Sequence, residues 1–217
     1  MTCRRIRTSG QRIIGRMRRG RGIAAVWPVL CALSATVTCA ADTAALTEKC
    51  ATCHGPQGYS EQPDVPVIAG FSRQGFIDTL AAFRDGDRVA IEYHPPGSAA
   101  RMMNDIAREL TDAEVEVLAD YYSRLPFVAR HQPFDDALAS RGAVVHDKLC
   151  ERCHSNGGSE PEDDAAILAG QWTPYLRRQF ADIADGKRRV PRAMLKRFQQ
   201  LDDSDKEALL HFYASLR

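Results

Sequence analysis

Apolar residues recur at three- and four-residue steps in several parts of the chain, which is the spacing of one face of an α-helix. Between residues 76 and 83 the apolar positions are Phe76, Ile77, Leu80, Ala81 and Phe83. This pattern predicts an amphipathic helix that ends at Asp85 and Gly86, because glycine commonly follows the last helical turn. Residues 111–114 have the sequence of a capping box. They predict the start of another amphipathic helix, which buries Val115, Leu118, Ala119 and Tyr122.

The second half of the chain repeats this order of helices. Helices are expected over 136–149 and over 175–184, where Gly186 follows the second of them. A last helix is expected to begin at 202–205 and to turn inward Leu209, Leu210, Phe212 and Tyr213. A helix over 42–49, with Thr43 as its cap, is expected to lead into the first half.

The stretches between these helices are rich in glycine, proline and polar residues, which predicts loops. They cover 55–65, 89–100 and 155–164, and the second of them contains the run Pro95-Pro96-Gly97. No segment shows the strict alternation of apolar and polar residues that is typical of a strand. The pattern therefore predicts an all-α fold.

A fixed offset of 100 residues relates the two halves of the chain. Cys50 corresponds to Cys150, and Arg88 corresponds to Arg188. An offset that holds from the cysteines to the arginines indicates a duplicated domain. Pro126 is expected to end the last helix of the first half. The expected organisation is a first domain over 42–127, a linker over 128–136 and a second domain over 137–217.

The first 41 residues have the features of a secretory signal peptide. Eight arginines and no acidic residue lie within residues 1–21, and an apolar run over 22–37 follows. The run leads into small residues, so cleavage is expected near Ala40 or Ala41. A membrane anchor is the alternative, but the run contains Pro28 and is shorter than the roughly 20 apolar residues that span a bilayer. We therefore expect a periplasmic protein without a membrane span in its mature chain.

Removal of this segment changes both the cysteine count and the charge. Four of the seven cysteines remain, and all four lie in two short motifs, so no structural disulfide is expected. Eight of the 29 basic residues are removed, which leaves 21 against 28 acidic residues and a net charge near −7. An acidic chain is a poor partner for nucleic acid, whose backbone is anionic.

The remaining cysteines form two C-x-x-C-H motifs, at 50–54 and 150–154. This is the attachment signature of a c-type haem, in which two thiols bind the vinyl groups and the histidine ligates the iron. A zinc site or a thioredoxin-like dithiol is the alternative, but both motifs place histidine directly after the second cysteine. We therefore expect two covalently attached haem c groups, with His54 and His154 as iron ligands and with thioether attachment at Cys50, Cys53, Cys150 and Cys153.

Methionine is the candidate for the sixth iron ligand in each half. Met103 and Met194 each lie seven residues before a leucine that precedes the last predicted helix of their half. Met102 is the alternative for the first haem, and His94 is a second alternative whose simpler interpretation is a solvated loop histidine. The other histidines are expected to be surface residues or packing residues without a role at iron, namely His131, His146 and His211.

Methionine ligation at both irons would leave no open position for a substrate, so the pattern favours electron transfer over catalysis at iron. The two halves differ in one loop, because His54 and Met103 are 49 residues apart whereas His154 and Met194 are 40 apart. The first half therefore carries about nine extra residues, within 90–100. Such insertions often form binding surfaces, although surface loops also tolerate them without a function.

The two-domain plan, with C-x-x-C-H, Ala-Gly and methionine in each half, resembles the small soluble two-haem cytochromes of bacteria. More specifically, three stretches resemble the cytochrome subunit of flavocytochrome c sulfide dehydrogenase, namely QPFDDALA at 132–139, HDKLCERCH at 146–154 and ILAGQWTPYL at 167–176. The similarity is close over these stretches and looser over the first domain. Trp172 and Tyr175 are expected either to line a haem pocket or to pack between the domains.

One position departs from this family. Pro66 stands two residues before Ile68-Ala69-Gly70, where relatives use the proline carbonyl to support the axial histidine, but Ala166 occupies the same place in the second half. A different acceptor is therefore expected to orient His154.

The resemblance implies two tandem cytochrome c-type haem domains, with His54 and Met103 on one iron and His154 and Met194 on the other. It also implies a heterodimer with a flavoprotein, which carries FAD, oxidises sulfide in the periplasm and passes electrons to this chain. The chain would be the non-catalytic subunit, and it would relay electrons to a soluble acceptor such as a small cytochrome.

Two other functions stay open on the sequence. A free-standing two-haem shuttle to a terminal oxidase would use the same residues without a fixed partner. A haem enzyme, such as a peroxidase or a sulfur-compound oxidase, would need one iron that lacks a strong sixth ligand.

Overall fold

The computed structural model describes residues 35–217, with side chains from residue 43 onward. Within this range no strand is present, and the β-type pairing consists of the isolated bridges Arg88–Arg188 and Tyr93–Arg101. The all-α fold is therefore confirmed. The expected signal peptide lies outside the described residues, except for the end of the segment, which belongs to the first helix.

The first half of the chain forms a lobe of four α-helices and one 3-10 turn. These are α1 (Ala35–His54), η1 (Pro56–Gly58), α2 (Arg73–Asp85), α3 (Met103–Glu109) and α4 (Asp112–Tyr122). Helix α1 begins before the expected start at residue 42 and continues through the first C-x-x-C-H motif. Thr43 consequently lies inside the helix and is not its cap, because residues 35–42 contain no proline or glycine that would end a helix.

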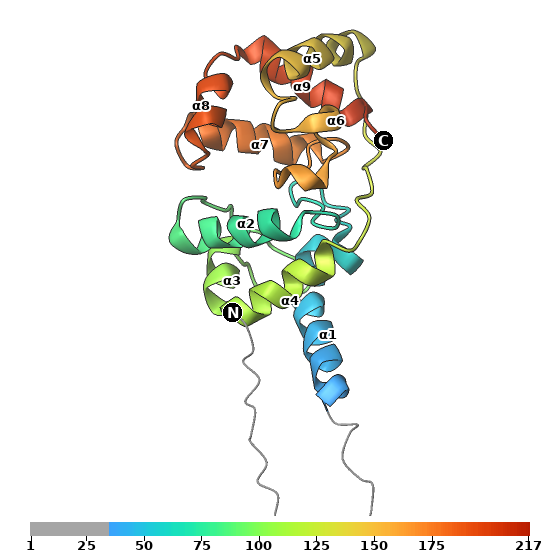
Figure 1. Ribbon diagram of the computed structural model, residues 1–217, viewed down its shortest axis with the longest axis vertical. Helices are drawn as coiled ribbons and strands as arrows, with labels where there is room; N and C mark the ends of the chain where they lie inside the picture. The colour runs from blue at the N-terminus through green and yellow to red at the C-terminus, as the bar shows by residue number, and fades with distance from the viewer. Residues whose placement is uncertain (1–34) are drawn as a thin grey trace, which may run out of the picture.

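The second half forms a lobe that repeats this order. Its elements are α5 (Asp136–Leu149), α6 (Ser155–Gly158), η2 (Pro161–Asp163), α7 (Thr173–Ala184), α8 (Arg192–Phe198) and α9 (Asp203–Ser215). Figure 1 shows the two lobes one above the other, with α7 on the side of the second lobe that faces α2. Among the described residues no helix is long and apolar enough to cross a membrane.

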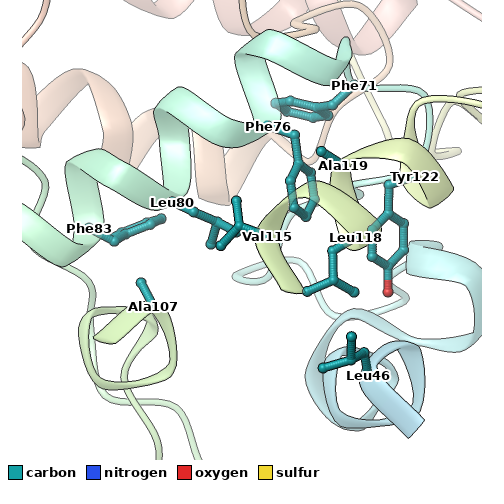
Figure 2. Packing of buried hydrophobic residues seen from close by; sticks show 10 residues of the cluster. All are labelled: Leu46, Phe71, Phe76, Leu80, Phe83, Ala107, Val115, Leu118, Ala119 and Tyr122. Atoms are coloured by element: carbon teal, nitrogen blue, oxygen red, sulfur yellow. The ribbon is translucent and has the colours of Figure 1, made fainter. Parts of the chain in front are cut away.

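The core of the first lobe lies between α1, α2 and α4 (Figure 2). It contains the predicted apolar face of α4, because Val115, Leu118, Ala119 and Tyr122 are all buried. The predicted capping box at the start of this helix is present, since the Thr111 side chain accepts a hydrogen bond from the Glu114 N–H and the Glu114 carboxylate accepts one from the Thr111 N–H. Gly86 follows α2 with a φ of 80°, a backbone conformation that glycine adopts without strain.

The core of the second lobe is built on α5, α7 and α9. Leu209, Leu210 and Tyr213 are buried as expected, whereas Phe212 is only partly buried. Helices α5 and α9 cross closely at Gly142, where a β-carbon would lie 2.1 Å from the Ala208 carbonyl oxygen. Glycine at this position therefore sets how near the two helices lie.

Apart from the four-residue α6, which lies in the predicted loop 155–164, two helices were not predicted from the pattern, namely α3 and α8. Each spans seven residues, which is too short for a helical periodicity to stand out. They correspond to one another in the repeat, and each carries the candidate methionine of its lobe in its first turn. The proposed boundaries at 127 and 137 stay a prediction, and the two hydrophobic cores lie on either side of them.

Candidate haem sites

A cavity of about 650 Å³ lies beside the first C-x-x-C-H motif. Its lining includes the two thiol groups, the histidine and the first candidate methionine of that lobe, Cys50, Cys53, His54 and Met103. This volume lies within the roughly 300–1,000 Å³ of sites that enclose a cofactor. The cavity therefore brings together the four side chains that the motif and the spacing predict for the first haem.

The histidine of this cavity is held in one tautomer. His54 Nδ1 lies 2.9 Å from the carbonyl oxygen of Pro66, which can only accept, so Nδ1 carries the proton. Burial lowers the pKa of His54 and keeps the imidazole neutral. Its Nε2 lone pair is therefore free for iron, and the predicted role of Pro66 agrees with this geometry.

The second histidine is oriented in the same way, which overturns the expectation of a different acceptor. His154 Nδ1 lies 3.2 Å from the carbonyl oxygen of Ala166. The expectation was wrong because the acceptor is a backbone carbonyl, which alanine supplies as well as proline when the chain path is kept. Burial also lowers the pKa of His154, so this imidazole too is neutral.

The two motifs differ in backbone conformation. The first forms the last turn of α1, whereas the second follows the end of α5 at Leu149 and consists of turns. Both the Cys153 N–H and the His154 N–H lie 3.0 Å from the Cys150 carbonyl oxygen, so the second motif still winds as a tight turn. The first motif is thus helical, and the second winds only approximately like a helical turn.

The state of the thiols argues against the zinc and dithiol alternatives. Burial raises the pKa of Cys50, Cys53 and Cys150. Zinc binding and disulfide exchange both need the thiolate, which a raised pKa disfavours. In residues 43–217 no three His, Cys, Asp or Glu side chains are grouped so that they could hold a metal ion.

The candidate sixth ligands lie in corresponding helices of the two lobes. Met103 lines the first cavity at the start of α3, and its neighbour Met102 does not. The side chain of His94 is 74% exposed, as expected for a loop histidine. Met194 is partly buried in the first turn of α8, the counterpart of α3. The assignment of Met103 and Met194 to iron stays a prediction.

The insertion of the first lobe forms a wall of its cavity. Ala90, Ile91 and Tyr93 belong to the lining, together with Ser98 and Ala99. Tyr93 and Arg101 exchange backbone hydrogen bonds of 3.0 and 2.8 Å, which close this segment into a loop. The sequence predicted either a binding surface or a tolerated insertion here. It could not show that the insertion lines the cavity, because that depends on how the chain folds back over the first motif.

A buried histidine beside the second motif was not recognised as part of the site. His146 is 2% exposed, and its Nε2 lies 2.9 Å from Glu151 Oε2 and 3.0 Å from the His154 carbonyl oxygen. Both partners are acceptors, so Nε2 carries the proton and Nδ1 accepts from the Tyr213 hydroxyl at 2.9 Å. The corresponding residue in the first lobe is Leu46, so this network belongs to the second site.

The first lobe lacks an equivalent polar network. Its Tyr122 corresponds to Tyr213, and the Tyr122 hydroxyl has no hydrogen-bond partner among the described residues. Figure 2 shows this hydroxyl pointing toward α1, the helix of Leu46. Burial, together with the nearby Cys50 sulfur, raises the pKa of Tyr122. The two sites thus share their axial histidine geometry and differ in the residues behind it.

Trp172 and Tyr175 connect the lobes. The Trp172 indole donates to the Ser60 carbonyl oxygen at 3.0 Å, and the Tyr175 N–H donates to the Pro63 carbonyl oxygen at 3.1 Å. Tyr175 also lines the first cavity, so both of its expected positions are realised at once. The first site is consequently completed by residues of the second lobe.

The donor set and the cavity fit a c-type haem at the first motif. Cys50 and Cys53 would form the thioether bonds, and the neutral Nε2 of His54 would bind the iron. The second motif offers the same donors, with Cys150 partly buried and Cys153 exposed.

Comparison with known proteins agrees with this chemistry. The family model described as cytochrome c matches residues 40–125. Cytochrome c4 of Azotobacter vinelandii is 30% identical over 149 residues, which cover 64% of this chain and 69% of that protein. The thiosulfate dehydrogenase electron acceptor of Thiomonas intermedia (strain K12) is 29% identical over 182 residues, which cover 79% of this chain and 78% of that protein.

Solved structures share the fold. Reduced cytochrome c4 from Pseudomonas stutzeri superposes with a TM-score of 0.65 at 24% identity, over 82% of this chain and 98% of that chain. Thiosulfate dehydrogenase from Marichromatium purpuratum gives the same TM-score and identity, over 82% of this chain and 40% of that chain. With both attachment motifs in place, the chain belongs to the cytochrome c family, as a dihaem c-type electron-transfer protein related to cytochrome c4 and to the thiosulfate dehydrogenase electron acceptor.

Proposed function

We propose that this chain is a periplasmic electron acceptor for a dehydrogenase that oxidises an inorganic sulfur compound, and that it relays the electrons to a soluble acceptor such as a small cytochrome. Its own residues hold two haems and carry out no substrate chemistry. The observation that supports the proposal is that Met103 and His54 both line the first cavity, where burial lowers the pKa of His54.

Both irons are proposed to be six-coordinate, with His54 and Met103 on the first and His154 and Met194 on the second. The haem supplies one-electron redox chemistry when it is bound, and methionine as axial ligand raises its potential relative to a second histidine. The protein fixes each imidazole through a backbone carbonyl and lines the first site largely with apolar side chains, which limit solvent access to a bound haem.

The ligand assignment can be tested with neighbouring methionines. Met103→Ala is expected to open the first iron, so that the reduced protein binds carbon monoxide at one of its two haems. Met102→Ala is the matched control, because Met102 lies outside the cavity lining, and this variant is expected to stay unreactive. Reactivity in the Met102 variant alone would reverse the assignment.

Sulfur chemistry is proposed from the relatives. One similar protein is named as the electron acceptor of a thiosulfate dehydrogenase. Three sequence stretches of the second half resemble the cytochrome subunit of a flavin-dependent sulfide dehydrogenase. The common element is a separate enzyme that oxidises a reduced sulfur anion and needs an electron acceptor.

Two partner enzymes are therefore candidates, and one experiment separates them. The oxidised holoprotein is mixed without oxygen with thiosulfate and a thiosulfate dehydrogenase, or with sulfide and an FAD-containing sulfide dehydrogenase, and haem reduction is followed by absorbance. The true partner is expected to reduce both haems much faster than its sulfur compound alone. Sulfide needs this comparison most, because it reduces haem proteins directly.

The partner assignment fails if neither enzyme accelerates reduction. If the holoprotein alone catalyses the oxidation of thiosulfate, the chain is itself an enzyme and not only an electron acceptor. Co-purification from the native host, followed by a flavin spectrum of the complex, gives the complementary result. A flavin that copurifies in equal amount supports the heterodimer with a flavoprotein.

A further inference from the structure

Helix α3 carries the first candidate methionine, and it is too short to be stable by itself. It spans Met103–Glu109, so most of its backbone groups lie in the terminal turns, where intrahelical partners are missing. It packs against the end of α2, and Figure 2 shows Ala107 of α3 beside Phe83 of α2. The position of α3 at the first site therefore depends on side chains that bind its two ends.

The start of α3 is held by Asn104, which directly follows Met103. The Asn104 Nδ2 group donates to the carbonyl oxygens of Phe83 at 2.7 Å and Arg88 at 2.8 Å. The Asn104 Oδ1 atom accepts from the Ala90 N–H at 2.8 Å. Asn104 is 7% exposed and does not belong to the lining of the first cavity, so it acts on that site through the backbone of α3.

The end of α3 is held by Arg84, which lies in the last turn of α2. Its Nε donates to the Ala107 carbonyl oxygen at 3.1 Å, and its Nη2 donates to the Leu110 carbonyl oxygen at 2.9 Å. Both carbonyls lie where the helix offers no donor of its own. The same guanidinium forms a 2.7 Å ion pair with Asp112 at the start of α4. Both ends of α3 are thus tied to α2.

Neither contact has a counterpart among the described residues of the second lobe. Leu195 takes the place of Asn104 directly after the candidate methionine, and a leucine side chain has no hydrogen-bonding group. Ala184 takes the place of Arg84 under the 100-residue offset of the repeat, and it is equally unable to donate. Helix α8 therefore lacks the side-chain hydrogen bonds that hold α3.

The contacts that do hold α8 are weaker or less directional. Arg197 Nη1 lies 3.4 Å from the Lys148 carbonyl oxygen and 3.5 Å from the Leu149 carbonyl oxygen, which exceeds the roughly 2.7–3.2 Å of ordinary N–H···O hydrogen bonds. Phe198 packs against Phe180 with ring centroids 5.8 Å apart. Apolar packing of this kind favours burial and does not fix one position along the helix.

This difference between the lobes affects how firmly each methionine can stay on its iron. An external ligand can bind only after the thioether sulfur has moved away, and the sulfur moves with the first turn of its helix. Displacement of α3 would leave the Asn104 amide and its partners buried and unpaired, which is costly. Displacement of α8 breaks no comparable group of bonds.

We propose that Asn104 and Arg84 are positioning residues that keep Met103 on the first iron, and that Met194 is the methionine that an external ligand displaces first. The two haems then have the same pair of axial ligands but differ in how readily the methionine is replaced. The inference rests on the proposed function, because it takes Met103 and Met194 as iron ligands.

Cyanide binding to the oxidised holoprotein measures this difference. Cyanide replaces methionine on ferric iron, so one Fe–S bond breaks, one Fe–C bond forms and the oxidation state is unchanged. At saturating cyanide the rate is set by methionine dissociation. Two phases of equal amplitude are expected in the haem absorbance, and the slow phase belongs to the first haem. Met194→Ala assigns the phases, because its second iron is open and only the first haem remains limited by methionine.

Asn104→Ala is expected to accelerate the slow phase roughly tenfold, because it removes a buried group with three hydrogen bonds. The fast phase is expected to stay unchanged and serves as an internal control for general loosening of the protein. Alanine is a better helix former than asparagine, so reduced helix propensity does not contribute. Asp105→Ala is the matched control, since Asp105 is an exposed residue of the same helix.

Arg84→Gln tests the other end of α3 and is also expected to accelerate the slow phase. Its matched control is Arg108→Gln, because Arg108 is exposed and pairs with Asp105 on the helix surface. Should Asn104→Ala fail to retain the first haem, Arg84→Gln decides alone, since the Arg84 side chain is 32% exposed and its replacement is better tolerated.

Three results would overturn the proposal. The first is a slow phase that Met194→Ala assigns to the second haem. The second is an unchanged slow phase in Asn104→Ala and Arg84→Gln variants that carry two haems. The third is an equal acceleration of both phases, because these residues would then only stabilise the protein as a whole.

Failure of this proposal can be told apart from failure of the proposed function. If Met103→Ala leaves the first iron closed to carbon monoxide, the ligand assignment is wrong and the positioning role falls with it. If Met103→Ala opens the first iron but Asn104→Ala and Arg84→Gln leave the slow phase unchanged, only the positioning role is removed. The electron-acceptor function then stands.

Discussion

The position of one proton explains why the histidine of each motif can bind iron through Nε2. In each lobe a backbone carbonyl fixes the proton on Nδ1, through His54 to Pro66 and His154 to Ala166. Burial keeps both rings neutral. The second site adds His146, which donates to the His154 carbonyl oxygen and so holds the motif from behind.

His146→Leu tests this support, because leucine is the residue that the first lobe uses at the same place. The change leaves the Tyr213 hydroxyl buried without its partner and removes the donor to His154. An unsatisfied buried polar group costs about 1–3 kcal/mol, so the free energy of unfolding in urea is expected to fall by this amount. His131→Leu, at an exposed position, is expected to change it by less than about 0.5 kcal/mol. Equal stability of the two variants would show that the network contributes nothing.

At the scale of single helices, some stabilising contacts join residues that are close in sequence, and a short sequence pattern predicts these. Other contacts join distant segments, and a short pattern does not predict them. The capping box of α4 is local, and it forms as its four residues predict. The crossing of α5 and α9 depends on Gly142, whose need for glycine comes from Ala208, far along the chain. Local chemistry is therefore visible in the sequence, and close approach between distant segments is not.

Gly142→Ala tests the close crossing of α5 and α9, because the substitution has two opposite effects on the free energy of unfolding. Alanine favours a helix over glycine by up to about 1 kcal/mol. Overpacking costs about 1–3 kcal/mol, and the new β-carbon would lie 2.1 Å from the Ala208 carbonyl oxygen. Net destabilisation is expected in chemical unfolding. Ser140→Ala on the exposed face of α5 is the control, and a Gly142 variant as stable as this control would contradict the close packing.

The capping box of α4 predicts a pH dependence. The Thr111 N–H, and then the Thr111 hydroxyl, hold the pKa of Glu114 below its usual 4.5. A folded-state pKa below the unfolded value stabilises the protein above pH 4.5, and this contribution is lost as pH falls through the lowered value. Glu114→Gln keeps a capping side chain that cannot titrate. The difference in melting temperature between wild type and this variant is expected to shrink below pH 4.5.

Loss of the cap itself gives a second measure of the same element. Thr111→Ala is expected to lower the free energy of unfolding at neutral pH by about 1 kcal/mol. If the difference in melting temperature between wild type and Glu114→Gln stays constant across the acidic range, the charge of Glu114 does not contribute to stability. That result would leave the contribution of the Thr111 hydroxyl standing.

At the scale of the whole molecule, the lobes are joined by buried hydrogen bonds. Gln171 is fully buried, and its amide donates to the Val67 carbonyl oxygen at 2.9 Å and accepts from the Val67 N–H at 3.0 Å. The amide thus pairs with a backbone of the other lobe as a strand would. The linker adds an Arg130 N–H to Gly170 oxygen bond of 2.8 Å.

Gln171→Ala is expected to uncouple the lobes. It leaves both polar groups of Val67 buried and unpaired, at a cost of about 1–3 kcal/mol for each group. Calorimetry of the holoprotein is expected to show a single transition for wild type and two separated transitions for the variant. Gln200→Ala at an exposed position is the control. A single unshifted transition in the Gln171 variant would mean that other contacts hold the lobes together.

The sequence predicts the haem motifs and most helices because these are local patterns, such as the C-x-x-C-H runs and the apolar face of α4. It offers a haem pocket or the domain interface for Tyr175, but not that this residue takes both positions by completing the cavity of the other lobe. It also does not predict that Arg88 meets Arg188 or that His146 supports His154. These three depend on how distant segments fold back on one another. The one incorrect inference at the site, about Ala166, took a side-chain identity as evidence for a bond that the backbone makes.

Carbon monoxide binding to the reduced holoprotein tests most directly whether the chain transfers electrons or acts on a substrate at iron. If both irons have histidine and methionine ligands, both haems are low-spin in the reduced state and carbon monoxide leaves the spectrum unchanged. A high-spin haem that binds carbon monoxide in the wild type would show an open coordination position. That result would contradict a pure electron carrier and favour a haem enzyme.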